Sequence, residues 1–428
     1  MGLGRFGGGA GAARHFLAHG AEVTVTDLAN REELGEPAEL LASSCRLVLG
    51  RHVEDDFRAA DVVVASPAVP TDHPLLHLAR RSGARVTTEI ELFLEACPAR
   101  LVGITGSNGK TTTAYLHHAL VEAAGERAAL TGNMGISLLP EVDALAPETI
   151  VTVELSSFQL ERLDATPRLD AAVVTRITPN HLDRHGTMER YAQAKARIVD
   201  LLQPGATLVV DARCRVAGEW TRRAADRGLR CVLVDDAAVD ETPEPLHLLG
   251  RANRRNLAMA ARAARTVVPR LDAAAITHVA RTHRSLPHRL ETVAVLAGTR
   301  FVDDSKATTP EATAAAIEGL TARIHLIAGG RDKGMDPAPL LAAARRCATV
   351  TLLGETAPRL ATRLPGAARA SDLDQAVRMA CAAARSGDVV LLSPGHASHD
   401  MFRDYRARGR AFREAVTALG ARAERGGL

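Results

Sequence analysis

The segment Gly106–Thr113 constrains the fold of this chain more than any other stretch. It reads Gly-Ser-Asn-Gly-Lys-Thr-Thr-Thr, follows the apolar run Leu101–Thr105 and precedes the helix-like segment Ala114–Ala124. Glycines let backbone N–H groups close around phosphate oxygens, and the start of a helix adds partial positive charge. A strand, a glycine-rich turn and a helix in this order therefore predict a site for the phosphates of a nucleoside triphosphate.

The side chains of this loop suit that role. Lys110 can reach the β- and γ-phosphates, and Thr111 can offer its hydroxyl to Mg²⁺. The strict pattern has another glycine where this chain has Ile104, so a chance glycine turn ahead of a helix is the alternative. We prefer an ATP site because the lysine, the threonine and the strand coincide. The predicted contacts of ATP in this loop are Gly106, Asn108, Gly109, Lys110, Thr111 and Thr112.

Short runs of Val, Ile and Leu alternate with Ala-, Arg- and Glu-rich helical segments along almost the whole chain. Many of these runs are continuously apolar, which is typical of strands buried on both faces of a parallel sheet. The predicted fold class is therefore α/β. The predicted strands are 22–26, 61–65, 101–105, 150–155, 171–175, 207–210, 300–303, 324–328, 349–353 and 388–392. Helices are predicted over about 188–202 and 256–281, and from Pro310 onward.

Composition argues against several classes of function. Lys and Arg number 53 against 50 Asp and Glu, and aromatic residues make up 3%, so we expect no nucleic-acid partner. No apolar stretch approaches the ~18 residues that a membrane span requires, and the N-terminal residues lack the apolar core of a signal peptide. The six cysteines are scattered without a C-x-x-C pair. We therefore expect a soluble cytoplasmic protein.

The length of 428 residues suggests about three domains at roughly 150 residues each. One seam is the Pro-containing link 96–100 before the phosphate-loop strand, and the other lies near 284–289, after the long helical stretch. The predicted domains are therefore residues 1–97, 98–284 and 285–428.

A second glycine-rich turn lies near the N-terminus, with Gly2, Gly4 and Gly7 in G-x-G-x-x-G spacing and Asp27 twenty residues further on. This pattern is typical of a dinucleotide site with Asp27 near a ribose, and a nucleoside diphosphate sugar would use the same turn for its pyrophosphate. A strand should precede the turn, but only Met1 does. We therefore expect the first strand of this domain to be truncated.

Three positions after the phosphate loop are candidates for a magnesium site. Glu154 ends a buried strand, where a carboxylate can hold Mg²⁺ beside a triphosphate, although a surface glutamate is the alternative. His181 and His185 have zinc-site spacing, but Leu182 replaces the required glutamate. His181 as a ligand of a harder cation is preferred, with a helix N-cap region as the alternative. Lys195 is, by composition alone, an ordinary helix lysine.

The last third of the chain has polar turns after three of its strands. Asp304 and Lys306 suit a nucleotide contact at the carboxyl end of a strand, and a helix-capping loop is the alternative. The turns Gly329–Gly334 and Ser393–Ser398 follow two other strands. Together they suggest a rim that captures a small anion, with Lys333 as the partner of a carboxylate.

These motifs together resemble the Mur ligase family over essentially the whole chain. Gly103–Thr113 is general to the Mur and folylpolyglutamate ligases. Segments more particular to the members that add D-glutamate are Glu154–Leu160, His181–His185, Pro287–Glu291, Asp304–Thr308 and Ser393–Arg408. The resemblance implies a Rossmann-like UDP-sugar domain, a central P-loop ATPase domain with a mostly parallel sheet, and a Rossmann-like C-terminal domain for the amino acid.

The resemblance also implies roles for single residues. Lys110, His181 and Lys195 would be catalytic, with Lys195 carbamylated so that it offers a carboxylate-like ligand. Mg²⁺ would be held by Thr111, Glu154, His181 and Lys195. Beyond the phosphate loop, ATP would contact Asn133, Asn253, Asn256, His288, Arg289 and Asp304. The UDP-sugar would contact Gly4, Arg5, Phe6 and Asp27, and the glutamate would contact Thr308, Lys333, Ser398 and Tyr405. The chain departs from the family's usual residues at Asn180, Ala252, Thr309 and His396.

The activity implied by the resemblance is ATP-dependent addition of D-glutamate to UDP-N-acetylmuramoyl-L-alanine through an acyl phosphate, by a cytoplasmic monomer that makes peptidoglycan precursors. The D configuration rests on the resemblance alone. Alternatives are a ligase of the same family that adds L-glutamate or extends folate, a dehydrogenase that binds NAD at Gly2–Gly7 and Asp27, and a nucleotide-binding module without catalysis.

Overall fold

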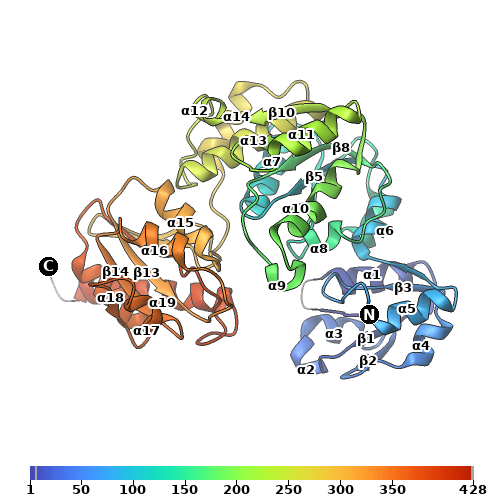
Figure 1. Cartoon of the computed structure of the whole chain (residues 1–428), viewed down its shortest axis with the longest axis horizontal. Coiled ribbons are helices and arrows are strands. Elements are labelled where there is room, and N and C mark those ends of the chain that lie inside the picture. The colour runs from blue at the N-terminus through green and yellow to red at the C-terminus, as the bar shows by residue number, and fades with distance from the viewer. Residues whose placement is uncertain (5–6, 426–428) are drawn as a thin grey trace. The chain divides into compact units, whose positions relative to one another are not determined.

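The computed structural model describes residues 1–4 and 7–425 and confirms the predicted α/β fold (Figure 1). The described chain divides into two compact units. The first unit contains residues 1–177, 181–238 and 258–276, and the second contains residues 178–180, 239–257 and 277–428.

A six-stranded parallel sheet lies at the centre of the first unit, in the order β10-β9-β8-β5-β7-β6. Its strands are β5 (Arg100–Thr105), β6 (Ala128–Gly132), β7 (Ile150–Glu154), β8 (Leu169–Val174), β9 (Leu202–Asp211) and β10 (Arg230–Val234). In the register of the sheet, Ile104 of β5 lies opposite Glu154 of β7, and Thr105 lies opposite Val174 of β8. The segments that follow β5, β7 and β8 therefore meet at one edge of the sheet.

Helices accompany this sheet and complete the middle of the chain. They are α7 (Lys110–Ala123), α8 (Ser157–Leu160), α9 (Leu182–His185), α10 (Met188–Ala196), α11 (Ala217–Asp226), α12 (Asp236–Asp240), α13 (Arg251–Val267) and α14 (Ala273–Thr282), with 3₁₀ turns η1 (Leu139–Ala144) and η2 (Arg197–Val199). The core of this region combines the buried residues of β7 and β8 with Tyr191, Ile198 and Trp220. Burial of such side chains is the main stabilising term, at roughly 1.5–3 kcal/mol for each large apolar group.

The N-terminal part of the first unit contains two parallel strand pairs. They are formed by β1 (Thr24–Asp27) with β2 (Arg46–Leu49), and by β3 (Val62–Val64) with β4 (Arg85–Thr87). Residues 1–3 lie between the pairs, because the Gly2 N–H donates to Thr26 O at 2.8 Å and the Ser66 N–H donates to Met1 O at 2.9 Å. The helices are α1 (Gly8–Ala18), α2 (Arg31–Leu34), α3 (Glu36–Leu41), α4 (Glu54–Ala59), α5 (Pro74–Arg81) and α6 (Glu89–Ala96).

The second unit contains another six-stranded sheet, in the order β11-β12-β16-β13-β14-β15. Its strands are β11 (Glu291–Leu296), β12 (Thr299–Asp303), β13 (Ile324–Gly329), β14 (Thr349–Leu353), β15 (Ala368–Arg369) and β16 (Val389–Leu392). All pairs are parallel except the β11–β12 hairpin. The helices are α15 (Pro310–Gly319), α16 (Ala338–Ala344), α17 (Ala357–Ala361), α18 (Leu373–Ala383) and α19 (Tyr405–Arg425). Helices α15, α16 and α17 pack in one apolar cluster with this sheet, and α18 and α19 pack in a second.

Each predicted strand is present, with ends that differ by up to about five residues. Strands β2, β4, β6, β10, β11 and β15 were not predicted. The prediction of one helix over 188–202 was wrong at its end, because α10 stops at Ala196 and Leu202 already belongs to β9. The Leu201 carbonyl accepts the Leu169 N–H at 2.8 Å, which draws the chain into the sheet. The helical stretch 256–281 is interrupted near Pro269, since proline cannot continue a helix.

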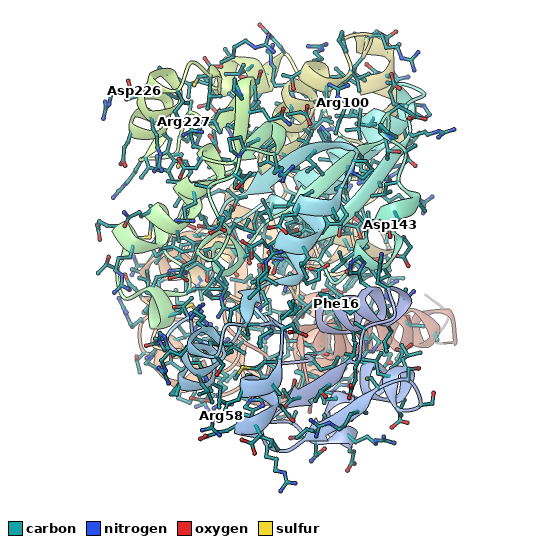
Figure 2. All side chains as sticks on the ribbon, turned by 90° about the vertical axis from the view of Figure 1, so that its right-hand side faces the viewer. Phe16, Arg58, Arg100, Asp143, Asp226 and Arg227 are labelled. Atoms are coloured by element: carbon teal, nitrogen blue, oxygen red, sulfur yellow. The ribbon has the colours of Figure 1, made fainter. Side chains whose placement is uncertain are left out.

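Charged side chains extend from the outside of the molecule, among them Arg58, Asp226 and Arg227 (Figure 2). The figure also labels Phe16 on α1 and Asp143 on η1, two elements that pack together in the first unit. Among the described residues, none of the helices combines the length and the apolar character that crossing a membrane requires.

Candidate active site

The phosphate loop has the backbone that its glycines predict. Gly106 has φ +146° and Gly109 has φ +86°. Gly109 is the N-cap residue of α7. A Cβ on Gly106 would lie 1.8 Å from Thr175 Oγ1, so no larger residue fits there. Thr175 Oγ1 lies 2.7 Å from the Asn108 carbonyl, which accepts a hydrogen bond from it, and Lys110 Nζ donates to Ser107 O at 2.9 Å. The loop thus leads directly into the N-terminus of α7, whose first residue is Lys110, and a helix start with a lysine suits an anion.

Glu154 lies beside this loop and is 2% exposed, so the alternative of a surface glutamate was wrong. Its Oε1 accepts a hydrogen bond from Asn133 Nδ2 at 3.1 Å, and the Asn133 N–H donates to the Glu154 carbonyl at 2.9 Å. Its Oε2 is buried and has no hydrogen-bond partner among the described residues. A buried carboxylate oxygen without a partner is costly, and a bound cation would satisfy it.

Lys195 corrects the composition-based prediction of an ordinary helix lysine, because it is only 1% exposed. Its Nζ donates to Thr105 Oγ1 at 3.3 Å and lies 5.0 Å from the centre of the Tyr191 ring. Burial, followed by repulsion from Lys110, holds the pKa of this amine well below its usual value, and Glu154 opposes the shift. Burial therefore favours the uncharged form of this amine. No local sequence signal reveals this, since the burial results from tertiary packing of α10.

His181 is the N-cap residue of α9 and has φ +54°, so the helix start that was the alternative interpretation of this segment is present. Its ring meets the Phe158 ring edge-on at 4.9 Å between centroids. The His185 ring stacks on the Phe158 ring, with 5.4 Å between their centroids. Its Nε2 lies 3.0 Å from Ser157 Oγ. His185 is buried, and its Nε2 is occupied by the hydrogen bond with Ser157.

Two of the predicted magnesium ligands offer oxygen atoms that fit a divalent cation. Glu154 has an unpaired buried carboxylate oxygen, and Thr111 stands in the first turn of α7, next to Lys110. Oxygen ligands of this type suit Mg²⁺. The lowered pKa of the buried Lys195 amine favours its uncharged form, the form that carbamylation requires.

The N-terminal glycine turn and Asp27 come together as the spacing predicts. The Gly4 N–H donates to Asp27 Oδ2 at 3.1 Å, and the Ala29 N–H donates to Asp27 Oδ1 at 2.9 Å. Gly7 has φ +85° and caps α1. The predicted contacts Arg5 and Phe6 lie outside the described residues.

In the second unit, Asp304 lies at the end of β12 and is 8% exposed. Ser393 Oγ donates to its Oδ2 at 2.8 Å, and the Leu290 N–H donates to its Oδ1 at 3.2 Å. Burial raises the pKa of this carboxyl to about 7, and the hydrogen bonds from Ser393 and Leu290 oppose part of the rise. The charge of Arg289, the residue before Leu290, also lowers this pKa. Two of the residues predicted to contact ATP, Arg289 and Asp304, are therefore close enough to interact.

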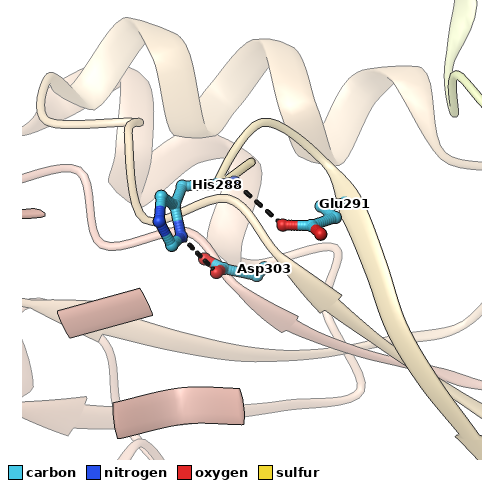
Figure 3. Close-up of side chains that lie close together, drawn as sticks. All are labelled: His288, Glu291 and Asp303. Atoms are coloured by element: carbon cyan, nitrogen blue, oxygen red, sulfur yellow. Dashed lines mark hydrogen bonds and ion pairs between the residues drawn. The ribbon is translucent and has the colours of Figure 1, made fainter. Parts of the chain in front are cut away.

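His288 faces inward in this turn (Figure 3). Its ring Nδ1 lies 2.7 Å from Asp303 Oδ2, and its backbone N–H donates to Glu291 Oε2 at 3.1 Å. The residue has φ +65° and is 8% exposed. Because Nδ1 is bonded to Asp303, any contact of the ring with ATP would have to use the other ring nitrogen.

In the first turns of α13, Asn253 donates to Leu249 O and accepts from Asn256 Nδ2 at 3.1 Å.

The four residues predicted for the amino acid differ in exposure. Ser398 is 2% exposed, Thr308 and Tyr405 are half-buried and Lys333 is exposed. Lys306 Nζ lies 4.1 Å from the centre of the Tyr405 ring, a cation–π geometry.

Sequence reasoning gave no role to Arg408, although it fixes this part of the second unit. It is 3% exposed and donates to Ser305 O at 2.9 Å, to His396 O at 3.1 Å and to Ala397 O at 3.3 Å. Burial lowers its pKa to about 10. The sequence signal was an arginine on a helix after several polar turns. It could not show the contacts, because Arg408 lies 103 residues from Ser305, whose carbonyl it binds.

The phosphate loop is flanked by a buried carboxylate, Glu154, and a buried lysine, Lys195. The chain also has an N-terminal α/β region with a glycine turn and a C-terminal α/β region. Together these features are typical of enzymes that use ATP. Three family models match the chain. They are the N-terminal domain of MurD-like Mur ligases over residues 1–88, the Mur ligase middle domain over 104–244 and the glutamate ligase domain of Mur ligases over 288–396. The chain belongs to the Mur ligase family.

Among curated relatives, the chain is 39% identical over 438 residues to the UDP-N-acetylmuramoylalanine--D-glutamate ligase of Symbiobacterium thermophilum, with 95% of each chain covered. It is 38% identical over 462 residues to the ligase of the same name from Roseiflexus sp., with 98% of each covered. Among solved structures, it resembles the MurF ligase of Thermotoga maritima in complex with ADP (TM-score 0.59, 17% identity, 86% of this chain and 97% of that one). At that identity the likeness supports the fold alone.

Proposed function

We propose that this chain joins D-glutamate to UDP-N-acetylmuramoyl-L-alanine at the expense of ATP, a step of peptidoglycan precursor synthesis. One observation carries the proposal: the chain is 39% identical, over 95% of both lengths, to a ligase named for this reaction. The predicted phosphate loop, Glu154 and Lys195 also adjoin one another in the first unit.

The reaction needs ATP because a carboxylate resists attack by an amine. In the first step, the carboxylate of the L-alanine moiety attacks the γ-phosphorus of ATP. The bond between the γ-phosphorus and the β,γ-bridging oxygen breaks, so ADP departs and an acyl phosphate is formed. In the second step, the glutamate amine attacks the acyl carbon, inorganic phosphate leaves, and the amine loses a proton. The first step brings two anions together, so positive charge from Lys110 and the start of α7 lowers its barrier.

Lys195 has a defined task in this scheme. A neutral buried amine can add to CO₂ with loss of one proton, and the product is a carbamate with a carboxylate-like end. The low pKa of the Lys195 amine supports this modification. Bound Mg²⁺, held by Thr111, Glu154, His181 and the carbamate, would supply charge neutralisation between the reacting anions.

The second unit would serve adenine and the amino acid. Arg289 precedes β11 and Asp304 follows β12, and the charge of Arg289 acts on the Asp304 carboxyl. We propose that ATP contacts both, together with His288, Asn253 and Asn256. We propose that the glutamate is bound by Thr308, Lys333, Ser398 and Tyr405. Lys333 is exposed and so is available to a carboxylate. We also propose a cytoplasmic monomer.

The test is phosphate release from ATP with UDP-N-acetylmuramoyl-L-alanine and either D- or L-glutamate. We expect release to depend on both the sugar nucleotide and D-glutamate. Release with L-glutamate alone, or with a folate in place of the sugar nucleotide, would assign the chain to another reaction of the family. Binding of NAD without ATP turnover would favour a dehydrogenase instead.

A further inference from the structure

The loop Gly132–Leu138, here called the bridging loop, contacts Glu154 on one side and the N-terminal glycine turn on the other. At its beginning, a Cβ on Gly132 would lie 2.2 Å from the Glu154 carbonyl, and Asn133 bonds the Glu154 side chain. The loop is closed on itself, since the Gly132 N–H donates to Ile136 O at 3.1 Å. Its shape is therefore set by its contacts rather than by a helix or a strand.

The other side of the bridging loop packs on the N-terminal glycine turn. A Cβ on Gly7 would lie 3.0 Å from the Gly135 carbonyl, and a Cβ on Gly11 would lie 2.3 Å from Ser137 Oγ. The bridging loop is thus in close contact with the start of α1. Under the proposed function, this turn binds the diphosphate of the sugar nucleotide.

Glu89, the first residue of α6, holds the bridging loop in place. Ser137 Oγ donates to Glu89 Oε1. The other carboxyl oxygen, Oε2, would lie 3.7 Å from a Cβ on Gly8, so it stands beside the first residue of α1. Burial raises the pKa of this carboxyl to about 7, and the hydrogen bond from Ser137 opposes part of the rise.

The other charged groups on the elements around Glu89 have partners of their own. These pairs are Arg14 with Glu141, His19 with Asp143, Glu91 with Thr87 and Glu95 with Arg85, and the His15 ring pairs with the Leu139 carbonyl. The bridging loop carries no charged residue. Two further charged groups lie at the glycine turn, and both have partners: Asp27 accepts the N–H groups of Gly4 and Ala29, and the Met1 amine donates to Val64 O. Among the described residues, Glu89 is therefore the carboxyl beside the first residue of α1 whose hydrogen-bond partner, Ser137, is uncharged.

We propose that Glu89 is a positioning residue for the sugar nucleotide, which takes up a proton when the diphosphate binds and then holds the bridging loop through Ser137. The reason is that a diphosphate at the start of α1 would place two negative charges near an anionic carboxylate, which favours the protonated form. This inference rests on the proposed function. It adds a structural connection, through the bridging loop, between the predicted sugar-nucleotide site and Asn133, which bonds Glu154.

The test compares wild type with Glu89→Gln, Glu89→Ala and Ser137→Ala in steady-state kinetics. For wild type, we expect KM for UDP-N-acetylmuramoyl-L-alanine to rise about threefold to tenfold from about pH 6.5 to about pH 8.5, while KM for glutamate stays constant. Glu89→Gln imitates the protonated carboxyl, so its KM should stay near the wild-type value at low pH throughout. Glu89→Ala should raise KM at every pH. Ser137→Ala should raise KM but keep the pH dependence.

Calorimetric titration in two buffers of different ionisation enthalpy measures the proton directly. Wild type should take up a substantial fraction of one proton per sugar nucleotide bound above about pH 7, and Glu89→Gln should take up none by this route. Glu95→Gln, on the same helix, is the matched control and should behave as wild type. If Glu89→Gln keeps the pH dependence and proton uptake of an active wild type, the inference about Glu89 is wrong. If wild type itself shows no reaction with the sugar nucleotide, the proposed function has failed instead.

Discussion

Replacing Lys195 tests the chemistry of the site most directly. The variants Lys195→Met and Lys195→Ala remove the amine that would be carbamylated, while Met keeps most of the side-chain volume. Loss of one preorganised electrostatic contact costs about 2.7–4 kcal/mol of barrier, which is about 10²–10³ in kcat. Binding of ATP should change much less, because the phosphate loop and Lys110 remain.

The same variants predict an unusual effect on stability. The pKa of Lys195 is lowered in the folded state, so the unfolded chain binds a proton at this amine more readily than the folded chain does. Wild-type stability from the unmodified amine therefore rises with pH until about 10.4, the pKa of an unfolded lysine. Lys195→Met removes that cost, so in buffer freed of CO₂, where no carbamate forms, its free energy of unfolding near pH 7 should equal or exceed that of wild type.

The assay is phosphate release with all three substrates, in buffers with and without bicarbonate and with short carboxylates such as acetate. Wild type should lose activity when CO₂ is removed, and Lys195→Ala should regain part of its activity with acetate. Arg190→Ala, an exposed position on the same helix, is the control. A fully active Lys195→Ala enzyme, or a wild type indifferent to CO₂, would refute the carbamate.

Three further predictions follow from the same geometry. Glu154→Gln should lower kcat about 10²–10³-fold and raise the Mg²⁺ concentration needed for half activity, and unchanged Mg²⁺ dependence would remove Glu154 from the metal site. Gly106→Ala should abolish ATP binding, because its Cβ would meet Thr175 Oγ1, and calorimetry with ATP would show this directly. For Asp304, whose folded pKa is raised to about 7, the folded state holds the extra proton, so wild-type stability should fall as pH rises from about 4 to about 7. Asp304→Asn should flatten that part of the denaturation profile, and an unchanged slope would contradict the burial argument.

Local sequence patterns were sufficient for the phosphate loop. Glycines at 106 and 109, followed by Lys110, predict a turn with positive φ that opens a helix, and the backbone has this form. The continuous apolar runs likewise predicted four strands of each large sheet, namely β5, β7, β8 and β9 in the first and β12, β13, β14 and β16 in the second. Short or partly exposed strands such as β2 and β10 were missed, because their burial depends on neighbours that no local window contains.

The neighbours of the phosphate loop were harder to predict. Glu154 follows an apolar run, and a surface position was an open alternative until the sheet placed it beside Ile104. Nothing around Lys195 distinguishes it from an exposed helix lysine, yet it is 1% exposed. Its role came only from the resemblance to a family. Glu89 and Ser137 carried no signal at all, since they are 48 residues apart and meet only in the fold.

The order of residues alone determined where a nucleotide's phosphates can be bound, because that site is made by consecutive backbone groups whose conformation glycine permits. Tertiary structure decided which titratable groups surround the site and in which protonation state. A pKa depends on burial and on charges a few ångströms away, and parallel strand order is what brings Glu154, Lys195 and Lys110 within that range.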